Sequence, residues 1–89
     1  MNPVFVGGAT ASTLEEAFEL SLSAIAPKPN RKLPHFIQLI DAPEPGADIN
    51  AFTTNWQSKL SPGEAVGWIV CTYPNGEHKY KILGKYEYI

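Results

Sequence analysis

The chain has 89 residues, with seven basic and nine acidic side chains, a net charge of −2 and one cysteine. This length permits one domain, residues 1–89, with one compact core. A single cysteine excludes an internal disulfide and a thiolate-rich zinc site. No apolar run is long enough to cross a membrane, and the acidic balance argues against a dedicated nucleic-acid-binding protein.

The N-terminus lacks the basic and apolar regions of a signal peptide. Together with the absence of a disulfide framework, this leads us to expect a cytoplasmic protein. A short acidic chain of this kind is also compatible with an accessory protein of a phage or mobile element.

Proline is over-represented: the chain has eight, against a typical proportion of about 5%. They fall between segments of regular hydrophobic period, at Pro3, Pro27, Pro29, Pro34, Pro43, Pro45, Pro62 and Pro74. Because proline costs a hydrogen bond inside a helix or a central strand, this distribution predicts a folded chain with prolines at element boundaries.

The first half of the chain predicts a short strand and a helix. Val4–Val6 is strand-like, and residues 13–26 have apolar side chains at helical spacing. Either Ser12 or Thr13 can cap this helix, since each is followed three residues later by a glutamate. Pro27 is expected to end it.

The middle of the chain predicts a strand and a second helix. Residues 35–41 are short and almost entirely apolar, which is typical of a strand buried on both faces. Asp48 can cap a helix over 49–60. The apolar face of that helix would consist of Ile49, Phe52, Trp56 and Leu60.

The last third predicts a β-hairpin around Asn75-Gly76, a sequence typical of a two-residue type I′ turn. This turn would place Cys71 opposite Tyr80, Ile69 opposite Ile82, Gly67 opposite Gly84, and Ala65 opposite Tyr86. These residues should face the core, and the Gly67–Gly84 pair would leave a notch for an aromatic ring from a helix, either Phe18, Phe52 or Trp56.

These elements predict an α+β fold in the order strand-helix-strand-helix-strand-strand. We expect a two-layer sandwich with a mixed sheet of about four strands, both helices on one face, and a C-terminal hairpin. The first strand-helix-strand unit would be a right-handed crossover joining parallel strands.

The outer face of the hairpin is the leading candidate site. It combines an apolar stripe with a rim of lysines, which is typical of an interface: Val66, Trp68, Val70 and Leu83, edged by Lys79, Lys81 and Lys85. Three occupants are open: a partner protein with an acidic rim, a second copy in a homodimer, or a terminal segment of this chain.

A second candidate is the glycine pair after the first strand. Gly7, Gly8, Thr10 and Ser12 would form a strand-to-helix loop able to cradle an anion or a small ligand on its backbone N–H groups, with Tyr80 and His78 nearby. Neither the P-loop lysine nor the three-glycine dinucleotide motif is present. The simpler interpretation is a flexible turn before a capped helix.

No catalytic or metal-binding set is evident. Cys71 and His78 would be diagonal across the hairpin, too far apart for a nucleophile pair. The loop acids Asp41, Glu44 and Asp48, and the lone His35, do not have metal-ligand spacing. We therefore expect no cofactor and no enzyme, and we interpret the chain as a protein–protein interaction module, regulatory or inhibitory in role. The alternative is a small-ligand or anion-binding protein, or a minor enzyme, that uses the glycine loop.

Overall fold

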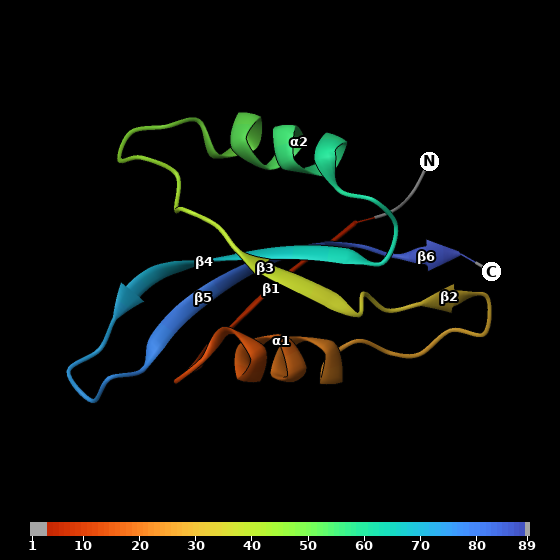
Figure 1. The fold of residues 1–89 in the computed structure, drawn as a ribbon, viewed down its shortest axis with the longest axis horizontal. Helices are drawn as coiled ribbons and strands as arrows, with labels where there is room; N and C mark the ends of the chain where they lie inside the picture. Colours follow the sequence, from red (N-terminus) through yellow and green to blue (C-terminus); the bar gives the residue numbers. More distant parts are fainter. Residues whose placement is uncertain (1–3, 89) are drawn as a thin grey trace.

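The computed structural model describes residues 4–88; residues 1–3, including Pro3, and residue 89 lie outside the described part. In chain order, the elements are β1 (Val4–Ala11), α1 (Leu14–Ser23), β2 (Arg31–Lys32), β3 (Phe36–Leu39), α2 (Ile49–Lys59), β4 (Glu64–Thr72), β5 (His78–Lys85) and β6 (Glu87–Tyr88). Four strands form a mixed sheet in the order β1-β5-β4-β3, and β2 pairs with β6 (Figure 1). The predicted α+β class, mixed four-stranded sheet and C-terminal hairpin are confirmed.

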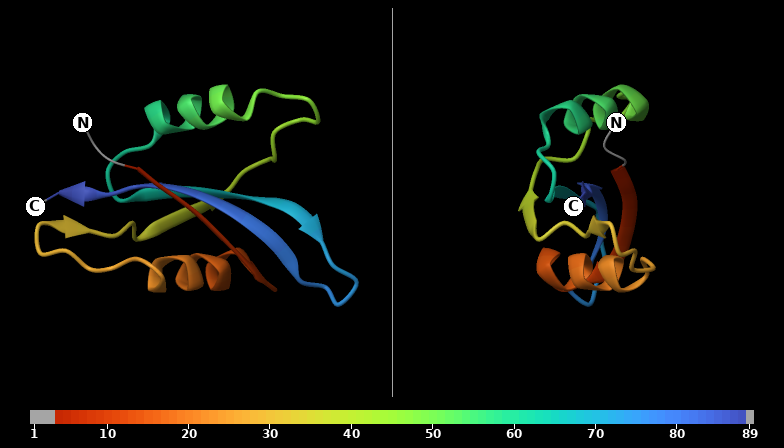
Figure 2. Two further views of the ribbon diagram at one scale, coloured as in Figure 1. Left: turned by 180° about the vertical axis from the view of Figure 1, so that it is seen from behind. Right: turned by 90° about the vertical axis from the view of Figure 1, so that its right-hand side faces the viewer.

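The two helices cover opposite faces of the sheet, so the prediction of both helices on one face is wrong (Figures 1 and 2). On one face, Phe18 of α1 belongs to a cluster that includes Tyr80 and Ile82 of β5. On the other, Phe52 and Trp56 of α2 pack against a second cluster. Together, β4 and β5 carry buried apolar side chains on both faces, so each face has to be covered by an element of its own.

The first strand-helix-strand unit joins β1 and β3, which lie at opposite edges of the sheet. β1 pairs antiparallel with β5, β5 antiparallel with β4, and β3 parallel with β4, so β1 and β3 run in the same direction, as predicted, without being neighbours. The parallel neighbours β3 and β4 are connected through α2. The edge position also explains why β3 is not buried on both faces: the exposed fractions of Phe36 and Leu39 are 53% and 55%.

Both helices begin at the side chains expected to cap them. The Thr13 hydroxyl accepts the Glu16 backbone N–H at 3.2 Å, which selects Thr13 over Ser12 as the cap of α1. The Asp48 carboxylate accepts the N–H groups of Asn50 and Ala51 at 3.0 and 3.3 Å. Helix α1 ends at Ser23, earlier than predicted, and α2 ends at Lys59, one residue earlier.

The hairpin turn is one residue longer than predicted. Tyr73 donates its N–H to the Glu77 carbonyl at 2.8 Å, and Gly76 donates to the Tyr73 carbonyl at 3.0 Å. Gly76 has a φ of +88°, whereas Asn75 does not have a positive φ, which excludes a type I′ turn. Pro74 therefore lies inside a three-residue loop, where its fixed φ suits the first central position of a type I turn.

The longer loop shifts the strand pairing by one residue, so Cys71 lies opposite Lys79. A β-bulge at Val70 shifts it by a second residue, so Ile69 lies opposite Tyr80 and Gly67 opposite Ile82. The total shift of two preserves the face of every side chain, which is why the predicted core face is correct up to Ile69.

The predicted glycine notch becomes two separate contacts. A Cβ atom on Gly84 would overlap the ring of Phe5 from β1, and a Cβ on Gly67 would lie 2.6 Å from Leu14 Cδ1 of α1. Phe5 of β1 thus fills the space over Gly84, and Leu14 of α1 fills the space over Gly67. The predicted candidates Phe18, Phe52 and Trp56 do not fill either space.

We predict that Gly84→Ala lowers the free energy of unfolding by about 2–3 kcal/mol, because the added methyl group displaces the Phe5 ring from a close-packed core. Urea denaturation measures this change. Gly7→Ala is the matched control, because its Cβ would meet Ser21 Cβ at an ordinary 3.4 Å, and we expect a change within about 0.5 kcal/mol. Equal losses in the two variants would contradict the packing explanation.

Candidate interaction site

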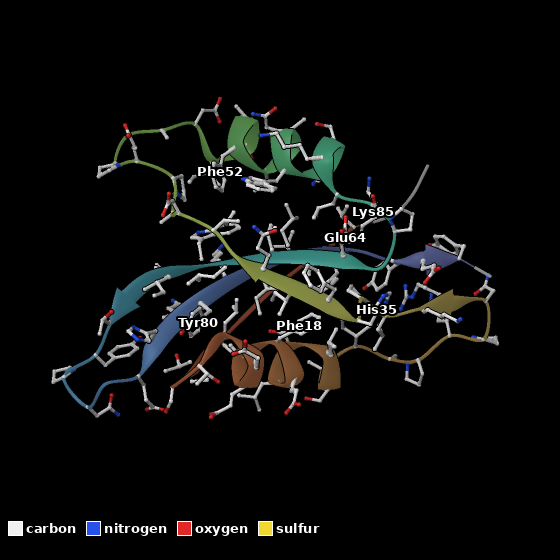
Figure 3. The ribbon with its side chains drawn as sticks, in the orientation of Figure 1. Phe18, His35, Phe52, Glu64, Tyr80 and Lys85 are labelled. Carbon is white, nitrogen blue, oxygen red and sulfur yellow. The ribbon has the colours of Figure 1, made fainter. Side chains whose placement is uncertain are left out.

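Helix α2 covers most of the stripe predicted as an exposed interface. Val66, Trp68 and Leu83 have exposed fractions of 1%, 4% and 0%, so these three residues of the candidate stripe are buried in the core and are not accessible to a partner. The ring of Phe52 meets the Trp68 indole edge to face, with 5.2 Å between centroids. Figure 3 shows Phe52 on the α2 side of the sheet, opposite Phe18 on the α1 side. Of the three predicted occupants of the stripe, the prediction of a segment of this chain is the right one, but the covering segment is α2 and not a terminal segment.

One of the three predicted rim lysines has a structural role. The Lys85 ammonium donates a hydrogen bond to the Leu60 carbonyl at 2.9 Å, in a partly buried position. Leu60 is the C-terminal cap of α2, so this bond joins β5 to the end of the helix and satisfies one of its free carbonyls. Lys79 and Lys81, in contrast, are exposed.

The edge of β4 that faces β3 is only partly paired. β3 pairs with β4 only as far as Leu39 opposite Gly67, and the Ile40 N–H makes the last contact, to the Gly67 carbonyl at 2.9 Å. β4 continues to Thr72. Within residues 4–88, no strand pairs with residues 68–72 of β4 on the side that β3 leaves. We call this stretch, residues 68–72, the open edge.

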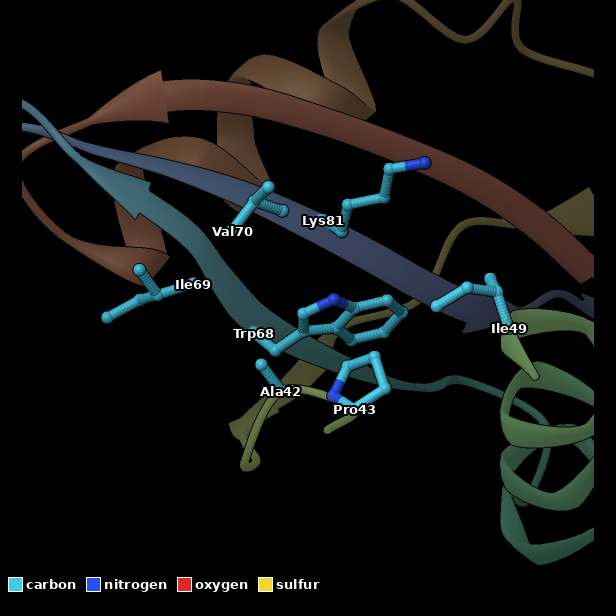
Figure 4. A pocket seen from close by; sticks show the side chains of 7 residues that line it. All are labelled: Ala42, Pro43, Ile49, Trp68, Ile69, Val70 and Lys81. Carbon is cyan, nitrogen blue, oxygen red and sulfur yellow. The ribbon is translucent and has the colours of Figure 1, made fainter. Parts of the chain in front are cut away.

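The open edge is bordered by two shallow apolar hollows. The first, the Trp68 hollow, has a volume of about 320 Å³ (Figure 4). It is lined by Ala42, Pro43, Ile49, Trp68, Ile69, Val70 and Lys81. The second, the Leu39 hollow, has a volume of about 310 Å³ and is lined by Leu39, Ile40, Asp41, Ala42 and Ile69. The hollows share Ala42 and Ile69, so they meet along the edge.

The exposed end of the predicted stripe belongs to the Trp68 hollow. Val70 has an exposed fraction of 49%, and Ile49, at the first turn of α2, has 52%. In Figure 4 the Trp68 indole lies between Pro43, Ile49 and the Lys81 side chain. Sequence reasoning identified Trp68, Val70 and Lys81 but missed Ala42, Pro43 and the role of Ile49. The only sequence signal for Ala42 and Pro43 was that two adjacent apolar residues stand in the loop before α2.

The glycine pair does not form a loop. Gly7 and Gly8 lie inside β1, opposite Ile82 and Lys81, and Thr10 lies opposite Lys79. Their backbone groups belong to an extended strand, and Ser12 is exposed outside both β1 and α1. The predicted strand-to-helix anion site at these residues is therefore wrong, because two glycines need not interrupt a strand that has a partner on one side.

The longer loop of the hairpin also separates Cys71 from His78. Cys71 lies opposite Lys79, whereas His78 lies opposite Thr72, and the Thr72 hydroxyl is 2.7 Å from His78 Nδ1. His78 also packs against the ring of Tyr80, with 5.7 Å between centroids. Tyr80 itself is buried on the α1 side. It is therefore not available to the small ligand that was predicted to bind beside Gly7 and Gly8.

Cys71 contacts a different neighbour, the exposed Tyr73. The Cys71 side chain raises the pKa of the Tyr73 phenol above its ordinary value of 10.0, first through a hydrogen bond and then through its charge, while Thr10 lowers it. Both groups lie at the hairpin end of the open edge.

Among residues 4–88, no three His, Cys, Asp or Glu side chains are grouped so that they could hold a metal ion. Of the loop acids, Asp48 caps α2. The part of the chain that the structure describes also has no helix of sufficient length and apolar character to span a membrane.

Comparison with known proteins identifies no relative: no family model matches the chain, and no curated protein or solved structure has significant similarity to it. The functional argument therefore depends on the geometry of the open edge.

We predict that Trp68→Ala lowers the free energy of unfolding by about 3–5 kcal/mol, because Trp68 is a core residue under α2. Thermal or urea denaturation measures the loss. Lys79→Ala, an exposed residue on the same hairpin, is the control and should stay within about 0.5 kcal/mol of the parent protein. A Trp68→Ala protein as stable as the parent would contradict burial of the indole.

Proposed function

We propose that this protein is an interaction module that binds an extended segment of a partner protein by strand addition at the open edge of β4. The observation that carries the proposal is the early end of β3, which leaves residues 68–72 of β4 without a neighbour between two apolar hollows. A bound segment would continue the sheet in the space next to β4 that β3 leaves vacant.

Strand addition suits this edge for two reasons. First, unpaired N–H and C=O groups of an edge strand form hydrogen bonds with any extended backbone, which gives affinity without a deep cavity. Second, two adjoining apolar hollows border this edge and would receive side chains of the added strand. The volumes of about 320 and 310 Å³ are large enough to take an apolar side chain each.

The open edge has few of the features by which proteins protect an edge from pairing. Charged residues and proline are two such features, and Trp68-Ile69-Val70-Cys71-Thr72 contains neither. The bulge at Val70 is the one such feature in this stretch, and the Val70 side chain is half exposed there. An uncharged edge with exposed apolar side chains supports an interaction role.

The opposite edge of the sheet provides the comparison for a test. β1 is also an edge strand, and Val6 has an exposed fraction of 60% against 49% for Val70. Val6 does not line the Trp68 hollow or the Leu39 hollow. A substitution at Val6 thus reproduces the chemistry of a substitution at Val70 without touching the proposed site.

We predict that linear peptides selected from a random phage-displayed library bind the parent protein and shift the backbone amide resonances of residues 68–72. Val70→Lys should weaken their binding at least about tenfold, because a charge replaces an apolar contact at the centre of the edge. Isothermal titration calorimetry measures the affinity.

Val6→Lys is the control for this experiment and should bind the peptides as the parent does. Thermal denaturation establishes that both variants are folded. Resonance shifts confined to β1, or equal affinities of the parent and Val70→Lys, would contradict the proposal. Self-association abolished by Val70→Lys would show instead that a second copy occupies the edge.

A further inference from the structure

We infer that copies of this chain associate head to tail, with the outer face of α1 in one copy against an uncovered part of the sheet in the next. The surface on the sheet lies over β1 and β5, so it is separate from the open edge of β4. The chain carries both surfaces, and they have opposite charge.

The surface on the sheet is formed by alternate residues of β1 and β5 that α2 leaves uncovered. Leu83 lies opposite Val6 and belongs to the cluster under α2, so this row of residues points to the α2 side. We call its exposed members the lysine face: Val6, Gly8, Thr10, Lys79 and Lys81. In Figure 4 the Lys81 side chain extends from β5 toward β1, which places its ammonium group over this face.

The charge of the lysine face is positive. β1 contains no charged residue, so Lys79 and Lys81 are the only charged members of the face. The acids of the neighbouring segments have other positions: Asp41 and Glu44 in the loop that leaves β3, the strand at the opposite edge, Asp48 at the cap of α2, Glu64 bonded to the Ser61 N–H, and Glu77 bonded to the Asn75 side chain in the hairpin turn.

The outer face of α1 has the opposite charge. Its exposed side chains, which we call the acidic face, are Glu15, Glu16, Glu19, Leu20 and Ser23. Helix α1 contains no basic residue. The exposed fraction of Leu20 is 54%, and this residue borders a shallow hollow of about 400 Å³ together with Glu16, Glu19 and Ser23. The acidic face thus combines an apolar side chain with a rim of acids, which is typical of an interface.

The charged residues of the two faces match in spacing. Lys79 and Lys81 are two residues apart on one strand, which separates them by about 6–7 Å along it. Glu16 and Glu19 are three residues apart on a helix, where such neighbours have Cβ atoms about 5–6 Å apart. Two lysine–glutamate pairs can therefore form at the same time when α1 of one copy lies on the lysine face of another.

The positions of the two faces favour head-to-tail contact over a two-fold dimer. The acidic face lies on the α1 side of the sheet and the lysine face on the α2 side, so the two cannot meet within one chain (Figures 1 and 2). A two-fold dimer would place lysines against lysines or glutamates against glutamates. Head-to-tail contact pairs opposite charges and also covers the exposed Leu20 and Val6.

The size of the contact predicts its strength. The acidic face belongs to one helix of ten residues, about 15 Å long. A contact of this size is typical of weak and transient association, and exposed ion pairs are screened by salt. We therefore expect self-association at protein concentrations near about 1 mM that added salt weakens.

Sedimentation velocity at about 20 mM salt tests the inference with two double variants. Glu16→Lys with Glu19→Lys makes both faces positive, and Lys79→Glu with Lys81→Glu makes both faces negative. We expect the average mass of the parent protein to rise with concentration, and each double variant to associate at least about tenfold more weakly. An equimolar mixture of the two variants should associate again, because positive faces then meet negative ones.

The controls separate the two faces from the net charge and from the open edge. Asp41→Lys with Glu44→Lys, and Lys28→Glu with Lys32→Glu, change the net charge as the test variants do but lie in exposed loops or in β2, so they should associate as the parent does. The variant that combines all four test substitutions keeps the parent's net charge of −2 and should also associate. Val70→Lys should leave the association intact.

Four results would overturn the inference: a parent protein that stays monomeric up to about 1 mM at low salt, test variants that associate as the parent does, a mixture of the two test variants that stays monomeric, or control variants that lose association equally. Loss of association in Val70→Lys alone would assign the contact to the open edge instead. Thermal denaturation establishes that every variant is folded. None of these results depends on peptide binding at the open edge, so the proposed function is tested separately.

Discussion

The structure depends on the burial of both faces of the central β-hairpin. β4 and β5 present Ala65, Tyr80 and Ile82 to one side and Val66, Trp68 and Leu83 to the other, and all six are buried. Apolar surface on two faces requires two covers, since each buried side chain contributes about 1.5–3 kcal/mol only when water is excluded from it. Helices α1 and α2 are those covers, and their placement on opposite faces follows from this requirement.

The two covers differ in completeness, and this difference creates the candidate site. Helix α1 contributes four buried residues, Leu14, Ala17, Phe18 and Ser21, whereas α2 has none that is fully buried within the helix. Helix α2 is attached at its C-terminal end, where Leu60 is buried and Lys85 binds the Leu60 carbonyl. Its first turn, with Ile49, remains half exposed beside Trp68, and the Trp68 hollow lies there.

The early end of β3 adds backbone to this apolar surface. Four residues of β3 pair with β4, and the chain then leaves toward the loop before α2. The same departure positions Ala42 and Pro43 against Trp68 and frees the outer side of β4 beyond Gly67. Hydrogen-bonding groups of β4 and two apolar hollows therefore lie together at one place, which is the basis for proposing that an extended segment binds there.

Local patterns in the sequence determined the elements. The helical spacing of apolar residues, the Thr13 and Asp48 caps and the prolines at boundaries are properties of neighbouring residues, and they defined both helices and the hairpin. Period-two alternation also assigned the core face of β4 and β5, since a register shift of two leaves it unchanged. Only the tertiary structure decided which face each helix covers, where β3 ends, and that Gly7 and Gly8 stay within a strand. These depend on contacts between residues far apart in sequence, such as Phe5 on Gly84 and Phe52 on Trp68, which no local period encodes. The Trp68 stripe was therefore visible in the sequence, but its division into a core and an accessible end was not.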